Sequence, residues 1–375
     1  MRILLIWSGH SVSTIDVARG YSAALRQLGH EVCDANLHNW YAYHSVALDA
    51  WHKRTGNDIP AGYLSQLATE QVGAEIVKFV PDVVLAVCGL ALHVAGFDMC
   101  WRLGVPMALI LTESPYLDVQ QVKRVQHQAV KLVFANDRVS VDPIRDELAR
   151  LSDSALAVAE QDEQRREAAR QMRAEVVYLP HSFDPERHYP AQQKHYTRDV
   201  YFYGTWWPER KRLLQPLKHW TMWRHPFWRV DIGGIGFDLG RKAIHHARSN
   251  ADLAEAYRHA RIALNHHRSV VGVEGGKEVH VREAYSIGPR AYEIAACGAF
   301  QLCDDTRPEL AEVFGDAVPT YRDADSLREQ VAYWLDPVHE QEREDRAWAS
   351  YQRVQRCAFE TRAREIVVPA LEGIV

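Results

Sequence analysis

The feature that most constrains the fold is an alternation of short apolar runs with segments of helical spacing. Residues 2–7, RILLIW, form a continuous apolar run, helical spacing follows over residues 15–28, and a new run begins at Glu31. Gly29 stands where the end of a helix favours a residue that tolerates positive φ. The pattern therefore predicts a β-α-β unit at the N-terminus, and such units build parallel sheets.

The same alternation continues along the chain in two series. Short apolar runs bounded by proline and polar residues are typical of strands buried on both faces of a parallel sheet. The first series predicts further strands in PDVVLAVC (81–88), PMALILTE (106–113) and AVKLVFAND (129–137). The second predicts strands in VYFYG (200–204), WRVDIGGIG (228–236), RIALNHH (261–267) and AFQLCDD (299–305), with helices in GPRAYEIAACG (288–298) and ADSLREQVAYWL (324–335).

The length of 375 residues exceeds the usual size of one hydrophobic core, so two domains are expected. We predict an α/β chain of two doubly wound, Rossmann-like domains that face each other across a cleft. Residues 148–175 contain no glycine or proline and predict a long exposed helix or helical pair, for which a solvated face is favoured over a partner-binding arm. Three prolines mark a linker at about 185–198, which gives domains at 1–190 and 191–345 and a helical tail at 346–375 that could cross back to the first domain.

Composition narrows the class of protein. The net charge of −5 argues against a protein whose main task is to neutralise many phosphates, although local basic patches remain open. No apolar stretch approaches the roughly 18 residues of a membrane span, and the N-terminal run is too short for a signal peptide, so we expect a cytoplasmic protein. The six cysteines form no C-x-x-C pair and fit buried, reduced thiols, and the histidines show no metal-site spacing, so no metal is expected.

The segment 286–300, SIGPRAYEIAACGAF, holds a helix with sharp ends and one unexpected residue. Gly288 and Pro289 are typical of a helix start and Gly298 of a helix end. Arg290 lies in the first turn, where free N–H groups and the helix dipole already favour an anion. A bound anion such as a pyrophosphate would explain this guanidinium, whereas an ion pair with Glu283 or Glu293 would explain it without a ligand, and spacing leaves both open.

Glu293 lies on the same, otherwise mostly apolar helix. An ionised carboxylate there needs partners, and the hydroxyls of a ribose or a structural arginine would both serve.

Several residues outside this helix are candidates for the site. Ser8 and Gly9 follow the first strand at a β-to-α turn, where backbone N–H groups could meet a phosphate or the acceptor, and a plain turn without a ligand would explain them equally well. Glu113 and Ser114 follow the strand at 106–113, at the sheet edge where ligands bind, and Glu113 is our candidate base or acceptor contact. His181 lies near the predicted crossover and could reach a donor sugar or phosphate, whereas His266 and His267 are expected to pack or to face solvent.

Two patterns resemble cofactor-binding or nucleic-acid-binding motifs but have simpler explanations. The glycines Gly234, Gly236 and Gly240 follow a strand but have the wrong spacing for a dinucleotide fingerprint, so NAD is not expected. Trp206 and Trp207 alternate with arginines as in some single-strand nucleic-acid binders, but core packing or sugar stacking explains them more simply.

The motifs together resemble a known family. In this order they are similar to the CgeB-like, spore-maturation-type glycosyltransferases, relatives of the family 4 retaining enzymes, and to glycosyltransferases of bacteriophages. The motifs are RILLIWSG at the N-terminus, LTESPY (111–116), FANDR (134–138), LPHSFDPERHYP (179–190), VYFYGTWWPERK (200–211), PRAYEIAACGAFQLCDDTRPELAEVF (289–314) and YRDADSLREQVAYWL (321–335).

The resemblance implies a GT-B fold, with an N-terminal acceptor domain and a C-terminal domain that binds a nucleotide-diphosphate sugar, most simply a UDP-sugar. It implies that Glu293 holds the donor ribose and that the helix start at Gly288, Pro289 and Arg290 lies against the pyrophosphate. It also implies a retaining transfer without metal. Arg210 occupies the place of the usual phosphate-contacting lysine, and Thr205 that of the usual arginine.

The expected phosphate contacts are thus Gly204, Thr205, Arg210, Lys211 and Arg290. The family places a second glutamate eight residues before Glu293, and this chain has Tyr285 there. The expected function is transfer of a sugar from a nucleotide-diphosphate donor to an acceptor hydroxyl, with a protein as the first choice of acceptor. A hydroxymethylated DNA base as acceptor, or a nucleotide-sugar-binding protein without catalysis, are the alternatives.

Overall fold

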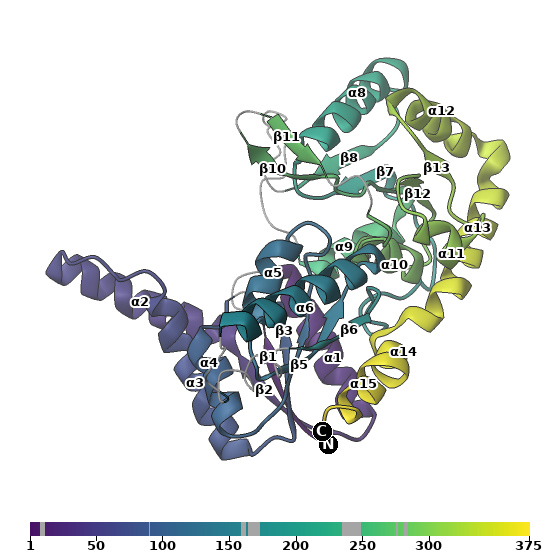
Figure 1. The fold of residues 1–375 in the computed structure, drawn as a ribbon. Coiled ribbons are helices and arrows are strands. Elements are labelled where there is room, and N and C mark those ends of the chain that lie inside the picture. The colour runs from purple at the N-terminus through teal and green to yellow at the C-terminus, as the bar shows by residue number, and fades with distance from the viewer. Residues whose placement is uncertain are drawn as a thin grey trace. The chain divides into compact units, whose positions relative to one another are not determined.

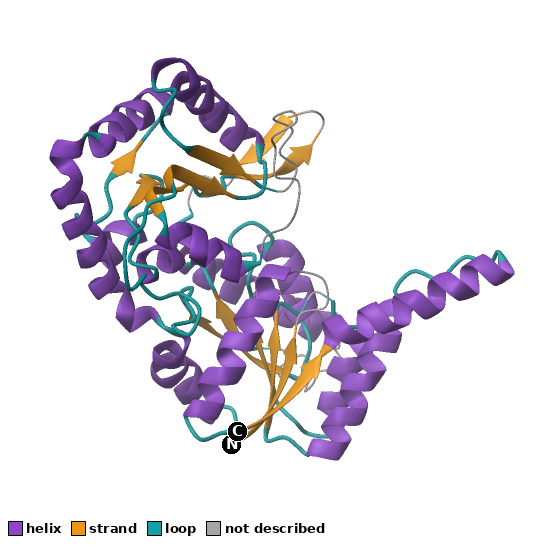
Figure 2. Ribbon diagram, turned by 180° about the vertical axis from the view of Figure 1, so that it is seen from behind, coloured by secondary structure: helices purple, strands orange, loops and turns teal. Residues whose placement is uncertain are grey.

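The computed structural model describes residues 1–7, 12–89, 91–158, 163, 173–234, 249–274, 277–280 and 284–375. The chain divides into two compact units. Unit 1 comprises Met1–Pro180 with Phe359–Val375, and unit 2 comprises His181–Ala358. Each unit holds one parallel sheet with helices packed on it (Figures 1 and 2).

Unit 1 contains a six-stranded parallel sheet in the order β2-β1-β3-β4-β5-β6. The predicted N-terminal β-α-β unit is present, and Gly29 follows its helix with a φ of 84°. The elements are β1 Arg2–Trp7, α1 Val12–Gln27, β2 Glu31–Asn36, α2 Leu37–Thr55, α3 Tyr63–Phe79, β3 Val83–Val87, α4 Val94–Arg102, β4 Met107–Ile110, α5 Asp118–Val125, β5 Val130–Ala135, α6 Val141–Val158 and β6 Glu175–Tyr178.

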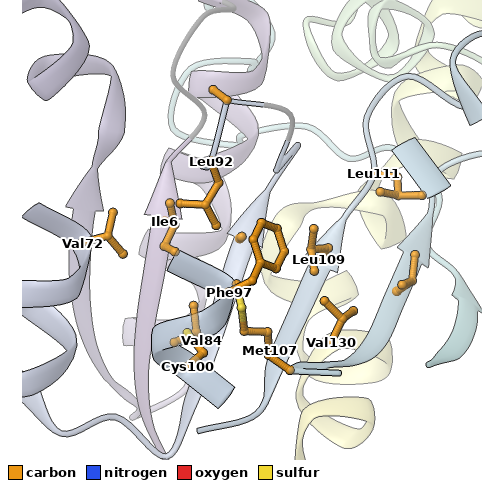
Figure 3. Packing of buried hydrophobic residues seen from close by; sticks show 14 of the residues in the cluster. Ile6, Val72, Val84, Leu92, Phe97, Cys100, Met107, Leu109, Leu111 and Val130 are labelled. Carbon is orange, nitrogen blue, oxygen red and sulfur yellow. The ribbon is translucent and has the colours of Figure 1, made fainter. Parts of the chain in front are cut away.

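The unit 1 sheet is buried on both faces, because alternate residues of its strands enter two different cores. Leu4 and Ile6 join a core with residues of α3 and α4, while Ile3 and Leu5 join a core with residues of α1. Figure 3 shows the first of these cores, with Phe97 of α4 among the strand residues. This explains why the strands are continuous apolar runs rather than alternating ones.

Unit 2 contains a five-stranded parallel sheet in the order β13-β12-β9-β7-β8 and a separate two-stranded hairpin. All four strands predicted for this half of the chain are present. The elements are β7 Arg198–Tyr203, α8 Pro208–Arg224, β8 Val230–Gly233, α9 Asn250–Arg258, β9 Ala260–Asn265, the hairpin strands β10 Val270–Glu274 and β11 Lys277–His280, α10 Pro289–Ala296, β12 Gln301–Asp304, α11 Glu309–Phe314, β13 Thr320–Tyr321, α12 Ala324–Leu335 and α13 Glu340–Val354.

The chain ends in unit 1. After α13 it continues through α14 Phe359–Arg362, a π-helical turn Ala363–Val367 and α15 Val368–Glu372, which pack against α1. Phe359 lies edge-on to Tyr21 and directly above Gly20, where a Cβ atom would come within 2.3 Å of its ring. Gly20 thus allows α1 and the C-terminal segment to approach closely.

Among the elements that sequence reasoning did not identify are strand β6, the β10–β11 hairpin and helix α2, which extends away from the rest of unit 1 (Figure 1). The long helix expected over 148–175 is helix α6 as far as Val158, and residues 159–162 and 164–172 lie outside the described residues. All six cysteines are free thiols. Among the described helices, none is both long and apolar enough to cross a membrane.

Candidate functional site

The carboxyl ends of three central strands of unit 2 bring polar residues to one sheet edge. Strand β7 ends before Gly204, β9 ends before His266 and β12 ends at Asp304. The chain leaves β7 toward β8 on one side of the sheet and leaves β9 toward β12 on the other. The edge between β7 and β9 is therefore a topological switch point, the place where open α/β sheets bind ligands.

Two guanidinium groups converge at this switch point. Around a Cβ atom built on Gly204, the nearest heavy atoms are Nη1 of Arg290 at 3.1 Å and Nη1 of Arg210 at 3.2 Å, with the Phe202 ring also at 3.2 Å. Arg210 comes from α8 and Arg290 from α10, 80 residues later in the chain. The structure thus brings together three of the predicted site residues, and it leaves room at Gly204 only because glycine has no side chain.

Backbone carbonyls hold Arg210 in place. Its Nη1 donates to the Thr205 carbonyl at 3.0 Å, and its Nε and Nη2 donate to the His266 carbonyl at 3.2 and 2.6 Å. The side chain is buried, and no acidic partner appears among these three bonds. These three acceptors are neutral carbonyls, so the bonds do not cancel the charge of the guanidinium, which can attract an anion.

The start of α10 has the geometry that the sequence predicted. Gly288 is the N-cap residue and Pro289 the first helical residue, and no side chain of the described residues caps this end of the helix. Pro289 has no N–H, and the N–H of Ala291 donates to the Gly288 carbonyl at 3.1 Å, so the N–H groups of Gly288 and Arg290 are those that this helix start can offer to a ligand. Gly298 follows the helix with a φ of 64°.

Arg290 is anchored mainly by a neutral group. Its Nε donates to the hydroxyl of Tyr257 at 3.1 Å. Burial opposes the charged form, but Tyr257 and Glu293 outweigh it and raise the pKa of Arg290, so the guanidinium stays protonated. Glu293 is half-buried one turn further along α10, and Glu283 lies outside the described residues.

A buried histidine and aspartate occupy the ends of β9 and β12. Asp304 Oδ1 accepts hydrogen bonds from His267 Nδ1 at 2.9 Å and from the His267 backbone N–H at 2.7 Å. Burial raises the pKa of Asp304, but His267 and then His266 outweigh it and hold that pKa well below its ordinary range. Asp304 is therefore an ionised carboxylate that orients the imidazole of His267.

Cys303 lies beside this pair, so that donor atoms of His267, Cys303 and Asp304 are within 4.8 Å of one another. Three such side chains can form a metal centre. Burial, however, raises the pKa of the Cys303 thiol well above its ordinary value, and only the thiolate binds a metal strongly. Because Oδ1 of Asp304 already accepts two hydrogen bonds, we interpret the group as a hydrogen-bonded network.

The remaining predicted residues of unit 2 are distributed around this edge. Thr205 is exposed and contributes through its carbonyl, and Lys211 is exposed on α8. His181 is the first residue of unit 2, where burial and the nearby His267 lower its pKa to about 4, so it is neutral at pH 7.

Backbone packing explains one of the glycines that resemble a dinucleotide fingerprint. Gly234 has a φ of 151°, and a Cβ atom there would lie 1.6 Å from the carbonyl oxygen of Gly204. Gly236 and Gly240 lie outside the described residues. The glycine after β8 therefore allows the β7 and β8 loops to touch, and this contact fixes the position of Gly204.

In unit 1 the corresponding edge carries Glu113. It follows β4, and its backbone N–H donates to Oε1 of the buried Gln121 at 3.3 Å. Ser114 exchanges hydrogen bonds with the buried side chain of Asn136 at the end of β5. Gly9, expected to bind phosphate, lies outside the described residues.

Three residues of the unit 2 edge were missed by sequence reasoning: Tyr257, His267 and Asp304. Tyr257 lies on α9 and shows no local motif. His267 and Asp304 each follow a predicted parallel strand, and the ends of neighbouring strands meet at one edge, so this signal was present in the sequence.

Comparison with known proteins agrees with this geometry. Residues 190–367 match a family model described as Glycosyl transferase-like, and this range contains nearly all of unit 2. This part of the chain is therefore similar to glycosyltransferases. No curated protein matches it significantly by sequence.

Solved structures extend the likeness to both units. A sucrose-phosphate synthase from Thermosynechococcus elongatus matches with a TM-score of 0.57 and 12% identity over 100% of both chains. A trehalose-6-phosphate synthase, studied for glycosyl transfer with retention, matches with a TM-score of 0.57 and 11% identity over 100% of both chains. A DNA-modifying β-glucosyltransferase, studied with and without uridine diphosphoglucose, matches with a TM-score of 0.55 and 12% identity over 99% of this chain and 100% of that chain. These likenesses confirm the predicted GT-B fold.

Proposed function

We propose that the enzyme transfers a sugar from a nucleotide-diphosphate sugar, most simply a UDP-sugar, to an acceptor hydroxyl. The observation that carries the proposal is the convergence of Arg210 and Arg290 on Gly204 at the switch point of the unit 2 sheet. A buried and a half-buried guanidinium beside a helix start without a side-chain cap can bind a polyanion, and a diphosphate fits that chemistry. The donors named for the structural neighbours, uridine diphosphoglucose among them, support the choice of UDP.

In this proposal unit 2 binds the donor. The diphosphate lies over Gly204, Thr205 and the α10 start at Gly288, Pro289 and Arg290. Glu293, one turn further along α10, holds the ribose hydroxyls.

The chemical step needs charge stabilisation above all. As the bond between the sugar and the β-phosphate breaks, negative charge grows on the leaving diphosphate. Arg210, Arg290 and Lys211, with the dipole of α10, stabilise that charge without a metal ion. We propose retention of the anomeric configuration, with the leaving phosphate helping to deprotonate the acceptor hydroxyl. The likeness to an enzyme studied for transfer with retention supports this mechanism.

Unit 1 would bind the acceptor, with Gly9 and Glu113 at the carboxyl edge of its sheet. There Glu113 contacts the acceptor or serves as its base, and His181 of unit 2 contacts the donor sugar or phosphate. A CgeB-like enzyme that modifies a protein is our first choice. The DNA-modifying neighbour and the phage-like motifs favour a second candidate, transfer to a hydroxymethylated DNA base, although the net charge of −5 speaks against it.

The test is incubation of the full chain with a panel of radiolabelled nucleotide-diphosphate sugars, in parallel with calorimetric binding of the free nucleoside diphosphates. We expect the enzyme to bind one donor and to hydrolyse it slowly when no acceptor is present. The nucleoside diphosphate released from that donor should compete with it for binding. Absence of binding and hydrolysis for every donor would refute the proposal. Label transfer to host proteins or to hydroxymethylated DNA then separates the two acceptors.

A further inference from the structure

Of the two ring nitrogens of His267, one is hydrogen-bonded and the other has no partner among the described residues. Its Nδ1 donates to Asp304, as described above, while its Nε2 is buried and has no hydrogen-bond partner among the described residues. Only 7% of the residue is exposed. A buried ring nitrogen without a partner costs free energy unless a ligand or water supplies one, so this atom needs an explanation.

The unused edge of the ring faces the start of α10. Around a Cβ atom built on Gly288, the one described heavy atom within 4 Å is Cδ2 of His267, at 3.9 Å. Nε2 is bonded directly to Cδ2. The imidazole therefore lies beside the start of an eight-residue helix that has no side-chain cap.

The segment before α10 is held firmly, so this alignment is built into the fold. The backbone N–H of Ile287 donates to Oε2 of the buried Glu309 at 2.8 Å, and Ile287 itself is fully buried. His267 is fixed from the other side by its two bonds to Asp304. Neither partner of the His267–Gly288 contact can move without breaking a buried bond.

We propose that His267, oriented by Asp304, is a diphosphate-binding residue of the donor site that donates a hydrogen bond from Nε2 to the phosphate of the nucleotide. This inference rests on the proposed function. The imidazole lies between two anions in the complex, the Asp304 carboxylate and the phosphate, and both favour its doubly protonated form. Binding therefore brings one proton onto Nε2, and no covalent bond changes.

The other ionisable groups around His267 set the conditions of this proton uptake. The groups are Cys303 and Asp304 on β12, His266 directly after β9, and His181. Burial first, and in part Arg210 and His267, lower the pKa of His266 to about 4, so it stays neutral.

The experiment measures UDP binding by calorimetry at about pH 8 in buffers of different ionisation enthalpy, which gives both the affinity and the protons taken up. We expect His267→Gln to weaken UDP binding at least tenfold, to leave uridine binding unchanged and to take up fewer protons than the wild type. His195→Gln, an exposed histidine before the opposite end of β7, is the matched control and should behave like the wild type.

Ring-¹⁵N NMR of the wild type provides a readout that does not depend on a variant folding. UDP should shift the His267 Nε2 resonance to its protonated position, and Asp304→Asn, which removes the orienting carboxylate, should lessen that shift. If UDP binds but His267→Gln keeps the wild-type affinity and the resonance does not move, the inference is wrong and the proposed function stands. If neither UDP nor any other nucleoside diphosphate binds, the proposed function fails first, and this inference with it.

Discussion

Replacement of Arg290 by alanine tests whether the two guanidiniums form a diphosphate seat. Arg290 Nη1 and Arg210 Nη1 lie 3.1 and 3.2 Å from the same point above Gly204, so a phosphate there could contact both. The substitution removes one of two cations and a pair of possible charge-assisted hydrogen bonds.

The size of the effect follows from that contact. A hydrogen bond to a charged group contributes about 1.5–3 kcal/mol, which corresponds to roughly a 10- to 150-fold loss of affinity for UDP. Because charge on the leaving group grows in the transition state, the rate should fall further, by about 10²–10³. Calorimetric binding of UDP and steady-state donor hydrolysis measure the two quantities.

Tyr257→Phe is the matched control. It removes the hydroxyl that accepts from Arg290 Nε but keeps the guanidinium, so it should cost about 1 kcal/mol of unfolding free energy and change UDP affinity far less than Arg290→Ala. Equal UDP affinities of the wild type and Arg290→Ala, with both proteins folded, would show that Arg290 serves only the packing of unit 2.

Three further substitutions test other parts of the account. Gly234→Ala should lower the free energy of unfolding in urea by about 3 kcal/mol or more, since the new Cβ would lie 1.6 Å from the Gly204 carbonyl oxygen. The control Gly104→Ala, at a φ of 69° with open space around it, should cost only about 1–2 kcal/mol. Equal losses in the two variants would contradict the close contact at Gly234. Glu113→Gln should lower the transfer rate about 10²-fold or more with UDP affinity unchanged, and an unaltered rate would exclude Glu113 as the base. The pKa of His181 is about 4 in the folded protein instead of 6.5, so between these pH values the unfolded chain binds one proton more than the folded protein. The free energy of unfolding should therefore rise with pH over this range, and His181→Gln should flatten the rise. An unchanged pH profile in His181→Gln would refute the buried neutral histidine.

The sequence predicted the sheets well because their strands are buried on both faces. Apolar runs such as ILLIW in β1 and VVLAV in β3 are typical of strands buried on both faces, and glycines such as Gly29 and Gly298 mark where helices end. Strand β6 was missed because EVVY is short and is followed directly by a proline-rich segment. The β10–β11 hairpin was missed because VEGGKEVH carries too little apolar periodicity.

Sequence reasoning selected a candidate residue where a local rule is broken, and it did not select residues that only the fold brings together. Arg290 was recognisable because a cation in the first turn of a helix contradicts the helix dipole. His267 and Asp304 are 37 positions apart and conform to every local rule. Only the parallel pairing of β9 and β12 brings them together. Only the folded structure shows that the ring of His267 lies beside Gly288, at the start of α10.

A crystal structure of the enzyme with UDP would test the central claim most directly. The account predicts both phosphates at the switch point of the unit 2 sheet, over Gly204, with oxygens in hydrogen-bond contact with Arg210, Arg290 and the first N–H groups of α10. UDP bound at the edge of the unit 1 sheet, or bound with its phosphates away from both guanidiniums, would contradict it.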